Sequence, residues 1–135
     1  MSLLLDTCAV LWVANGDSIS EQAREAIDEA AASDSVFVSP ISAWEIATLV
    51  QKGRLMLSMA PDSWFEALLA LPGVRLAPMP PRTLMASAFL PGSPPSDPAD
   101  RIIAATARAE NLVLITRDRK LLSYGAEGHL RGLTC

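Results

Sequence analysis

The sequence predicts an α/β fold, a three-layer α/β/α sandwich with a central parallel sheet of four to five strands, formed by residues 1–135 as one domain. Strand-like segments alternate with helix-like segments along the chain. The strand-like segments are continuous apolar runs, which is typical of parallel strands covered by helices on both faces. With 135 residues, of which 50% are hydrophobic, the chain is long enough for one domain with its own core.

Four segments are predicted strands because each is a short run of apolar, β-branched or aromatic residues. They lie at residues 3–5, 35–39, 74–79 and 112–116. The run at 112–116, "LVLIT", is the last strand that the sequence predicts.

Helices are predicted between these strands from helix-forming residues and from start and stop signals. They cover residues 9–15, 20–33, 39–55, 61–73 and 98–111, with shorter helical pieces within 80–90 and 117–125. In the third of them, Ser39 and Pro40 are a typical start and Lys52-Gly53 a typical end. Because that helix is apolar nearly all round, we expect it to be buried.

Residues 78–98 hold seven of the ten prolines. We expect an irregular loop at 91–98, directly before the acids Asp97 and Asp100. A polar loop that is stiffened by proline and stands next to acidic residues is a candidate for a functional segment.

Composition excludes several classes of protein. No apolar run approaches the roughly 18 residues of a membrane span, and the N-terminus lacks the basic region of a secretory signal, so we expect a cytoplasmic protein. His129 is the only histidine, which excludes zinc sites that need several histidines and leaves little for a histidine-based triad. Cys8 and Cys135 form no disulfide framework, and we assign Cys8 to packing.

Four acidic residues fall where a parallel sheet would bring them together. Asp6 directly follows the first predicted strand, and Asp118 follows the last one by one or two residues, so both lie at the carboxyl edge of the sheet. Asp100 lies in the first turn of one helix and Glu45 about one turn into another, and both helices begin at that edge. Like charges ~4 Å apart cost on the order of 4 kcal/mol at a surface-like dielectric, so we expect a divalent cation among these acids.

A site made only of oxygen ligands suits Mg²⁺ or Mn²⁺, and such ions promote phosphodiester hydrolysis. The net charge of −4 argues at first against a nucleic-acid substrate, but without the four acids 11 acidic and 11 basic residues remain. Arg117, Arg119 and Lys120 form a small basic cluster beside Asp118. They are candidates for contacts with RNA, and the alternative is a solvated surface.

Each acid also has an interpretation that needs no metal. Glu45 could pair with Lys52 or Arg54. Asp6 and Asp97 could cap helices, and Asp100 could favour the positive end of its helix. Asp118 could be a turn residue.

The chain resembles the PIN-domain family and, within it, the VapC-type toxins of bacterial toxin–antitoxin pairs. The resemblance rests on "LLLDTCAVLW" (3–12), "SPISAWEIATLVQKGRL" (39–55), "SDPADRIIAATA" (96–107) and "LVLITRD" (112–118). It implies a ribonuclease that depends on Mg²⁺ or Mn²⁺. The implied catalytic and metal-binding residues are Asp6, Glu45, Asp100 and Asp118, with Thr7, Asp97 and Thr116 in supporting positions. Many relatives carry a histidine where this chain has Pro95, which weakens any inference about substrate contacts of that loop.

The resemblance also implies a homodimer and a small VapB-like antitoxin as a partner. Large apolar side chains are available for such a face or, alternatively, for the core: Trp12, Trp44, Trp64, Phe65, Met56 and Met59. Two other functions remain open at this point. One is a non-catalytic PIN-like module that binds RNA or protein. The other is a phosphatase with Asp6 as its nucleophile, against which Cys8 counts because such enzymes carry a second aspartate two residues after the first.

Overall fold

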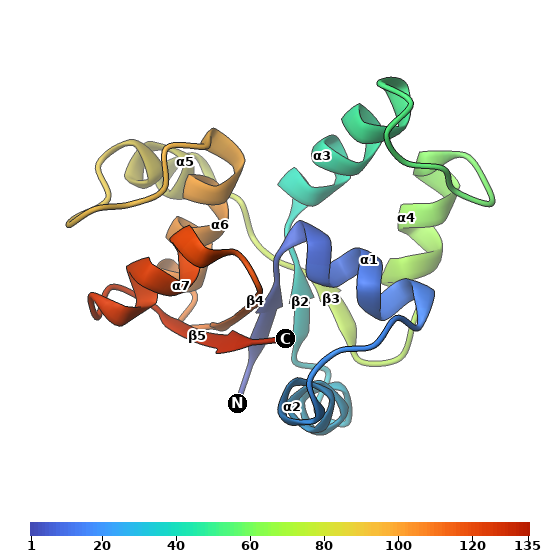
Figure 1. Cartoon of the computed structure of the whole chain (residues 1–135), viewed down its shortest axis with the longest axis horizontal. Helices are drawn as coiled ribbons and strands as arrows, with labels where there is room; N and C mark the ends of the chain where they lie inside the picture. The colour runs from blue at the N-terminus through green and yellow to red at the C-terminus, as the bar shows by residue number, and fades with distance from the viewer.

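The computed structural model describes all 135 residues and confirms the predicted α/β sandwich (Figure 1). Five parallel strands form one sheet in the order β3-β2-β1-β4-β5. The strands are β1 Leu3–Leu5, β2 Val36–Val38, β3 Val74–Leu76, β4 Val113–Thr116 and β5 Arg131–Thr134. The helices are α1 Thr7–Asn15, α2 Glu21–Ala31, α3 Pro40–Gln51, α4 Pro61–Leu69, α5 Pro81–Ala88, α6 Pro98–Ala109 and α7 Arg119–Ala126.

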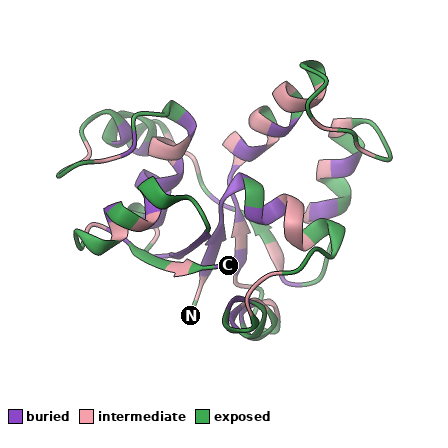
Figure 2. Cartoon of the chain, in the orientation of Figure 1, coloured by how far each residue is buried: buried purple, intermediate pink, exposed green.

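Side chains of the central strand β1 alternate between two cores, as the period of two along a strand requires. Leu3 and Leu5 pack into a cluster on the side of α1, α2, α3 and α4. Leu4 packs into a second cluster on the side of α6 and α7. Figure 1 shows these two groups of helices on opposite sides of the sheet. Figure 2 shows burial concentrated in the central strands β1, β2 and β4 and in parts of the helices, whereas the outer strands β3 and β5 are largely exposed.

The register of the sheet places the ends of β1 and β4 side by side. Leu5 pairs with Val38 on one side and with Ile115 on the other. Asp6 directly follows β1, and α3 begins two residues after Val38, so these segments meet at the carboxyl edge. None of the helices combines the length and the apolar character that crossing a membrane requires.

The strand at 112–116 is confirmed as the last buried strand, and β5, which the sequence did not locate, adds an exposed fifth strand beside β4. Its sequence, "RGLT", lacks an apolar run. An edge strand has a neighbour on one side only, and three of the four residues of β5 are exposed, so they need not be apolar. The first helix also begins earlier than predicted, at Thr7, because Asp6 caps it.

The prediction that the helix at 39–55 is buried all round is wrong as well. Within α3 only Ser42 and Ile46 are buried, and the side chain of Trp44 is 62% exposed. The helix packs mainly against α1, α4 and α6, and because part of its surface faces solvent, its apolar composition does not produce complete burial.

Candidate functional site

A cavity of about 280 Å³ at the carboxyl edge of the sheet contains all four predicted acids. We call it the acid cavity. Its lining residues are Asp6, Thr7, Cys8, Trp12, Glu45, Asp100, Arg117 and Asp118. Four segments far apart in the chain contribute these carboxylates: the end of β1, helix α3, the first turn of α6 and the residue before α7.

The aspartates are placed by helix capping. Asp6 Oδ1 accepts a hydrogen bond from the Ala9 backbone N–H at 2.8 Å and caps α1. Asp118 Oδ1 accepts one from the Leu121 N–H at 2.9 Å and caps α7. The capping interpretation of Asp6 is therefore correct, whereas Asp118 caps a helix instead of serving as a turn residue. Both roles are compatible with a place in the cavity because both helices begin at the carboxyl edge.

Asp97 does not line the cavity but lies directly beside it. It caps α6 and accepts a hydrogen bond from the Asp100 N–H at 3.0 Å. Asp97 therefore orients the first turn of α6, from which the Asp100 side chain enters the cavity.

Hydroxyl groups orient the carboxylates. Thr116 donates to Asp6 Oδ2 and accepts from the Asp118 backbone N–H at 3.0 Å, so it connects the residues that follow β1 and β4. Thr7 donates to Glu45 Oε1 at 2.5 Å, and its hydroxyl lies 2.9 Å from that of Ser42.

Sequence reasoning missed Ser42. It precedes Glu45 by three residues on α3, and residues at that spacing share one face of a helix. Its hydroxyl is fully buried and holds the Thr7 hydroxyl that binds Glu45. The signal that could have found Ser42 in the sequence is its position three residues before Glu45.

None of the cavity carboxylates has a basic partner. The structure contains one ion pair, between His129 and Glu127 at 3.7 Å. Glu45 therefore does not pair with Lys52 or Arg54, and that interpretation of Glu45 is wrong. Its only hydrogen-bonding side-chain partner is the Thr7 hydroxyl.

The carboxylates raise one another's pKa values. Burial, followed by the nearby charges of Asp97, Asp118, Glu45 and Asp6, raises the pKa of Asp100 to about 7. The pKa of Glu45 is raised mainly by burial, against the hydrogen bond from Thr7. Burial likewise raises the pKa of Asp6, although hydrogen bonds from Thr116 and Ala9 oppose the shift. The cavity therefore disfavours the charged forms of these acids, and no ion pair within the chain offsets that cost.

The donor set has the chemistry of a site for a hard divalent cation. Carboxylate and hydroxyl oxygens surround the cavity, and neighbouring negative charge is relieved when a divalent cation binds. No group of three or more His, Cys, Asp or Glu side chains is already arranged so that it could hold a metal ion. The carboxylates would therefore have to turn toward one another to complete a coordination shell.

The three predicted RNA-binding residues are separated by the structure. Arg117 lines the cavity, with its guanidinium carbon 4.0 Å from the ring centre of Trp12. Arg119 and Lys120 are exposed in the first turn of α7 and do not line the cavity.

The prediction that Cys8 serves core packing is wrong. Cys8 is exposed and lines the acid cavity, because it is the second residue of α1 and stands at the open edge of the sheet. The apolar candidates also separate: Trp64 is buried in the core, whereas Met56 is 93% exposed, Met59 46% and Trp44 62%.

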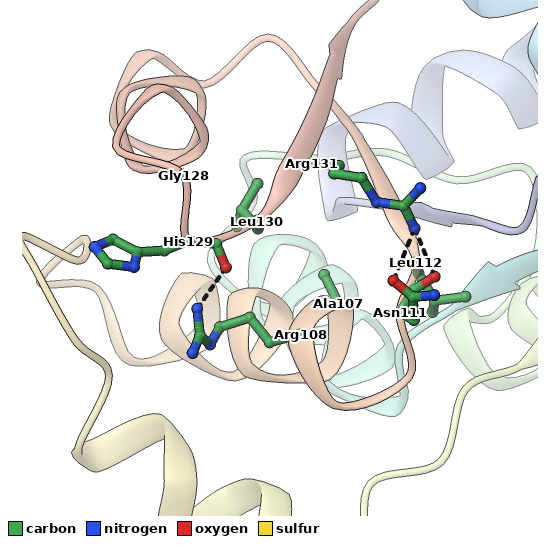
Figure 3. A pocket seen from close by; sticks show the side chains of 8 residues that line it. All are labelled: Ala107, Arg108, Asn111, Leu112, Gly128, His129, Leu130 and Arg131. Atoms are coloured by element: carbon green, nitrogen blue, oxygen red, sulfur yellow. Dashed lines mark hydrogen bonds between the residues drawn. The ribbon is translucent and has the colours of Figure 1, made fainter.

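A second cavity, of about 310 Å³, lies at the amino edge of the sheet, where β4 and β5 begin (Figure 3). Its charged residues contact carbonyl groups of this chain. Arg108 donates to the His129 carbonyl at 2.5 Å, and Arg131 donates to the Asn111 carbonyl at 2.9 Å and to Asn111 Oδ1 at 3.0 Å. We call it the arginine cavity.

A family model described as PIN domain matches residues 3–127. Ribonuclease VapC22 of Mycobacterium tuberculosis (strain ATCC 25618 / H37Rv) is 36% identical over 124 residues, which are 91% of this chain and 92% of that protein.

Solved structures of low sequence identity share the fold. VapBC2 from Rickettsia felis, bound to a DNA fragment from its promoter, has a TM-score of 0.72 at 16% identity and covers 99% of this chain and 98% of that chain. DNA-bound VapBC from Salmonella typhimurium has a TM-score of 0.69 at 16% identity, with coverages of 99% and 98%. FitAcB from Neisseria gonorrhoeae has a TM-score of 0.64 at 22% identity, with coverages of 97% and 96%.

Proposed function

This chain belongs to the PIN domain family, and from this premise we propose that it is an endoribonuclease that uses Mg²⁺ or Mn²⁺ and serves as the toxin of a VapBC-type toxin–antitoxin pair. The observation that supports the chemistry is the gathering of four carboxylates from separate segments in one cavity, with no basic partner for any of them. The curated relative is named a ribonuclease. We further propose that residues 1–135 form one PIN domain, and that the protein acts on RNA in the cytoplasm.

In this proposal Asp6, Glu45, Asp100 and Asp118 hold the cation and are the catalytic residues. When bound, the cation supplies Lewis-acid chemistry that activates water and stabilises charge on the phosphate. The hydroxyl groups of Thr7 and Thr116 keep Glu45 and Asp6 in place through their hydrogen bonds.

Asp97 supports the site from the cap of α6, where it orients the first turn that carries Asp100. Arg117, Arg119 and Lys120 contact the RNA backbone. Of these three, Arg117 is the one at the cavity itself.

The phosphatase alternative has no support in the geometry of the site. Enzymes of that kind carry a second aspartate two residues after the nucleophile, and the residue at that position in the acid cavity is Cys8. The non-catalytic alternative would normally lack some of the acids, and all four are present.

A VapB-like antitoxin is the proposed protein partner. Two of the structural neighbours are VapBC complexes, and large apolar side chains remain exposed on this chain at Trp44, Met56 and Met59. A basic side chain of the antitoxin would pair with the acid cavity in place of the cation. We also propose that the toxin is a homodimer.

The decisive experiment is cleavage of total RNA by the purified chain, with Mg²⁺, with EDTA, and with Mn²⁺ added after EDTA, followed by mapping of the new RNA ends. We expect cleavage that EDTA abolishes and that Mn²⁺ restores. The Asp6→Asn variant should lose cleavage by at least about 100-fold while it keeps its fold, because the amide keeps the shape of the side chain but not its charge. Its matched control is Asp62→Asn, which makes the same chemical change at an exposed position in the first turn of α4.

Equal cleavage by the parent and by Asp6→Asn would refute the proposal, as would cleavage that survives EDTA. Cleavage lost in both Asp6→Asn and Asp62→Asn would indicate a general loss of structure instead of a loss of chemistry. Circular dichroism and thermal unfolding of both variants separate these outcomes.

A further inference from the structure

Arg117 is the only cationic side chain among the residues that line the acid cavity, and it forms no ion pair there. It directly precedes Asp118 in sequence, and an exposed arginine next to several carboxylates would ordinarily pair with one of them. The absence of such a pair requires a physical cause.

Two contacts hold Arg117 away from the carboxylates. Its guanidinium carbon lies 4.0 Å from the centre of the Trp12 ring, which is cation–π contact, and Nη2 donates to the Ser18 carbonyl at 2.7 Å. Trp12 belongs to α1, is half-buried and packs against the core. It is therefore a fixed platform, whereas Arg117 is an exposed side chain that rests on it.

The position of Arg117 matters for the charge balance of the cavity. A guanidinium is planar and always charged, and it pairs with a carboxylate through two parallel hydrogen bonds. If Arg117 were free to turn inward, it would pair with a cavity carboxylate and compete with the divalent cation. Held at the rim, it leaves the carboxylates free, and the N–H groups that do not bind Ser18 remain available to the phosphate of a substrate.

We infer that Trp12 is a positioning residue, which keeps the Arg117 guanidinium at the rim of the acid cavity, out of ion-pair contact with the metal-binding carboxylates and available to an RNA phosphate. This inference rests on the proposed function, because it takes the cavity as a cation site. It assigns to Trp12 a role in metal affinity although Trp12 itself offers no ligand atom.

The test measures Mn²⁺ binding by calorimetry in the absence of RNA, for the parent and for Trp12→Leu, Trp12→Phe, Arg117→Gln and the double variant Trp12→Leu/Arg117→Gln. We expect Trp12→Leu to bind Mn²⁺ roughly three- to fivefold more weakly, because the released arginine pairs with a carboxylate. Trp12→Phe should lie between the parent and Trp12→Leu, since tryptophan is the strongest cation–π partner. The double variant should regain the affinity of Arg117→Gln, because the competing charge is gone.

The matched control is Trp44→Leu, which removes an exposed tryptophan that does not line the cavity and should leave Mn²⁺ affinity unchanged. In cleavage assays both Trp12→Leu and Arg117→Gln should raise KM more than they lower kcat. Thermal unfolding of Trp12→Leu tests whether the protein keeps its packing around this half-buried position. If the packing is lost, Trp12→Phe replaces Trp12→Leu as the test variant.

If Trp12→Leu and Trp12→Phe bind Mn²⁺ as the parent does, or if removal of Arg117 does not restore the affinity lost in Trp12→Leu, the inference is overturned while the proposed function stands. If the parent itself binds neither Mn²⁺ nor Mg²⁺, the proposed function fails, and the inference fails with it.

Discussion

The acid cavity and the arginine cavity lie at opposite edges of one sheet and have similar volumes, about 280 and about 310 Å³. Both contain several charged side chains. In the arginine cavity, Arg108 and Arg131 already bind carbonyl groups of the chain. In the acid cavity three of the four carboxylates accept hydrogen bonds from neutral groups, none has a cationic partner, and burial together with neighbouring charge raises the pKa values of Asp6, Glu45 and Asp100. The two cavities therefore differ in the sign of their charge and in the burial that raises the pKa values of Asp6, Glu45 and Asp100, not in size.

This difference has a consequence for stability. Arg131 donates two hydrogen bonds to Asn111, the residue after α6 that adopts a left-handed conformation, and so stabilises the turn between α6 and β4. Asp6, Glu45 and Asp100 do the opposite, because burial raises their pKa values and so makes their charged forms cost free energy until a cation binds. Residues that lower the stability of the fold they belong to are typical of functional sites.

The largest expected difference between the two cavities is in cleavage activity. Asp100→Asn should lower kcat/KM for RNA by at least about 100-fold, because it removes a carboxylate of the proposed cation site. Arg108→Gln in the arginine cavity should change kcat/KM by less than about twofold, within the small effects expected of surface changes away from a site. Single-turnover cleavage of a defined RNA measures both. An equal loss of kcat/KM in the two variants would show that the two cavities do not differ in function.

The second test is stability without metal. The pKa of Asp100 is raised to about 7 in the folded chain, so the folded state binds more protons than the unfolded state between pH 3.8 and about 7, and stability falls as pH rises through that window. Replacing this residue by asparagine should therefore stabilise the cation-free protein at pH 8 by about 1–2 kcal/mol, after allowance for partial exposure to solvent, and by little at pH 4.

Arg131→Gln is the counterpart in the arginine cavity. It should destabilise the protein by about 1 kcal/mol at either pH, because it removes hydrogen bonds that do not titrate. Urea unfolding in EDTA measures both variants. A loss of stability in Asp100→Asn at pH 8 would contradict the charge argument.

The third test is the pH dependence of cation binding. Because Asp100 binds a proton below about pH 7, the affinity for Mg²⁺ should rise roughly tenfold between pH 6 and pH 8. Calorimetry at three pH values measures this rise. The affinity of Asp100→Asn should be lower and should depend less on pH, and an equally steep profile in that variant would assign the titration to another group.

The smallest expected effect concerns RNA binding. Arg119→Gln and Lys120→Gln should each weaken RNA binding by about two- to threefold and lower the slope of log affinity against log salt by up to about 0.7, if each residue contacts one phosphate. Fluorescence anisotropy in the presence of EDTA separates binding from cleavage. Arg131→Gln is the control at the other edge, and an equal effect there would show that RNA also reaches the arginine cavity.

Sequence reasoning succeeded where a local pattern decides the structure. Apolar runs predicted four of the five strands, and Asp6 and Asp97 were candidates for helix caps because a short acid before a helix binds free N–H groups. It failed where neighbours decide. β5 carries no apolar run because it lies at an edge, and α3 is only partly buried although it is apolar, because it packs mainly against other helices and faces solvent in part.

By itself the sequence determined which acids stand at the carboxyl edge, because parallel strands and the helices that follow them have a fixed direction, and a residue's place in that order locates it at one edge. Only the tertiary structure decided how these acids are held and what surrounds them: the Thr116 bridge between Asp6 and Asp118, the Ser42 hydroxyl behind Thr7, and the stacking of Arg117 on Trp12. These contacts join residues up to 110 positions apart, and no local pattern encodes a distance between side chains that meet only after the chain has folded.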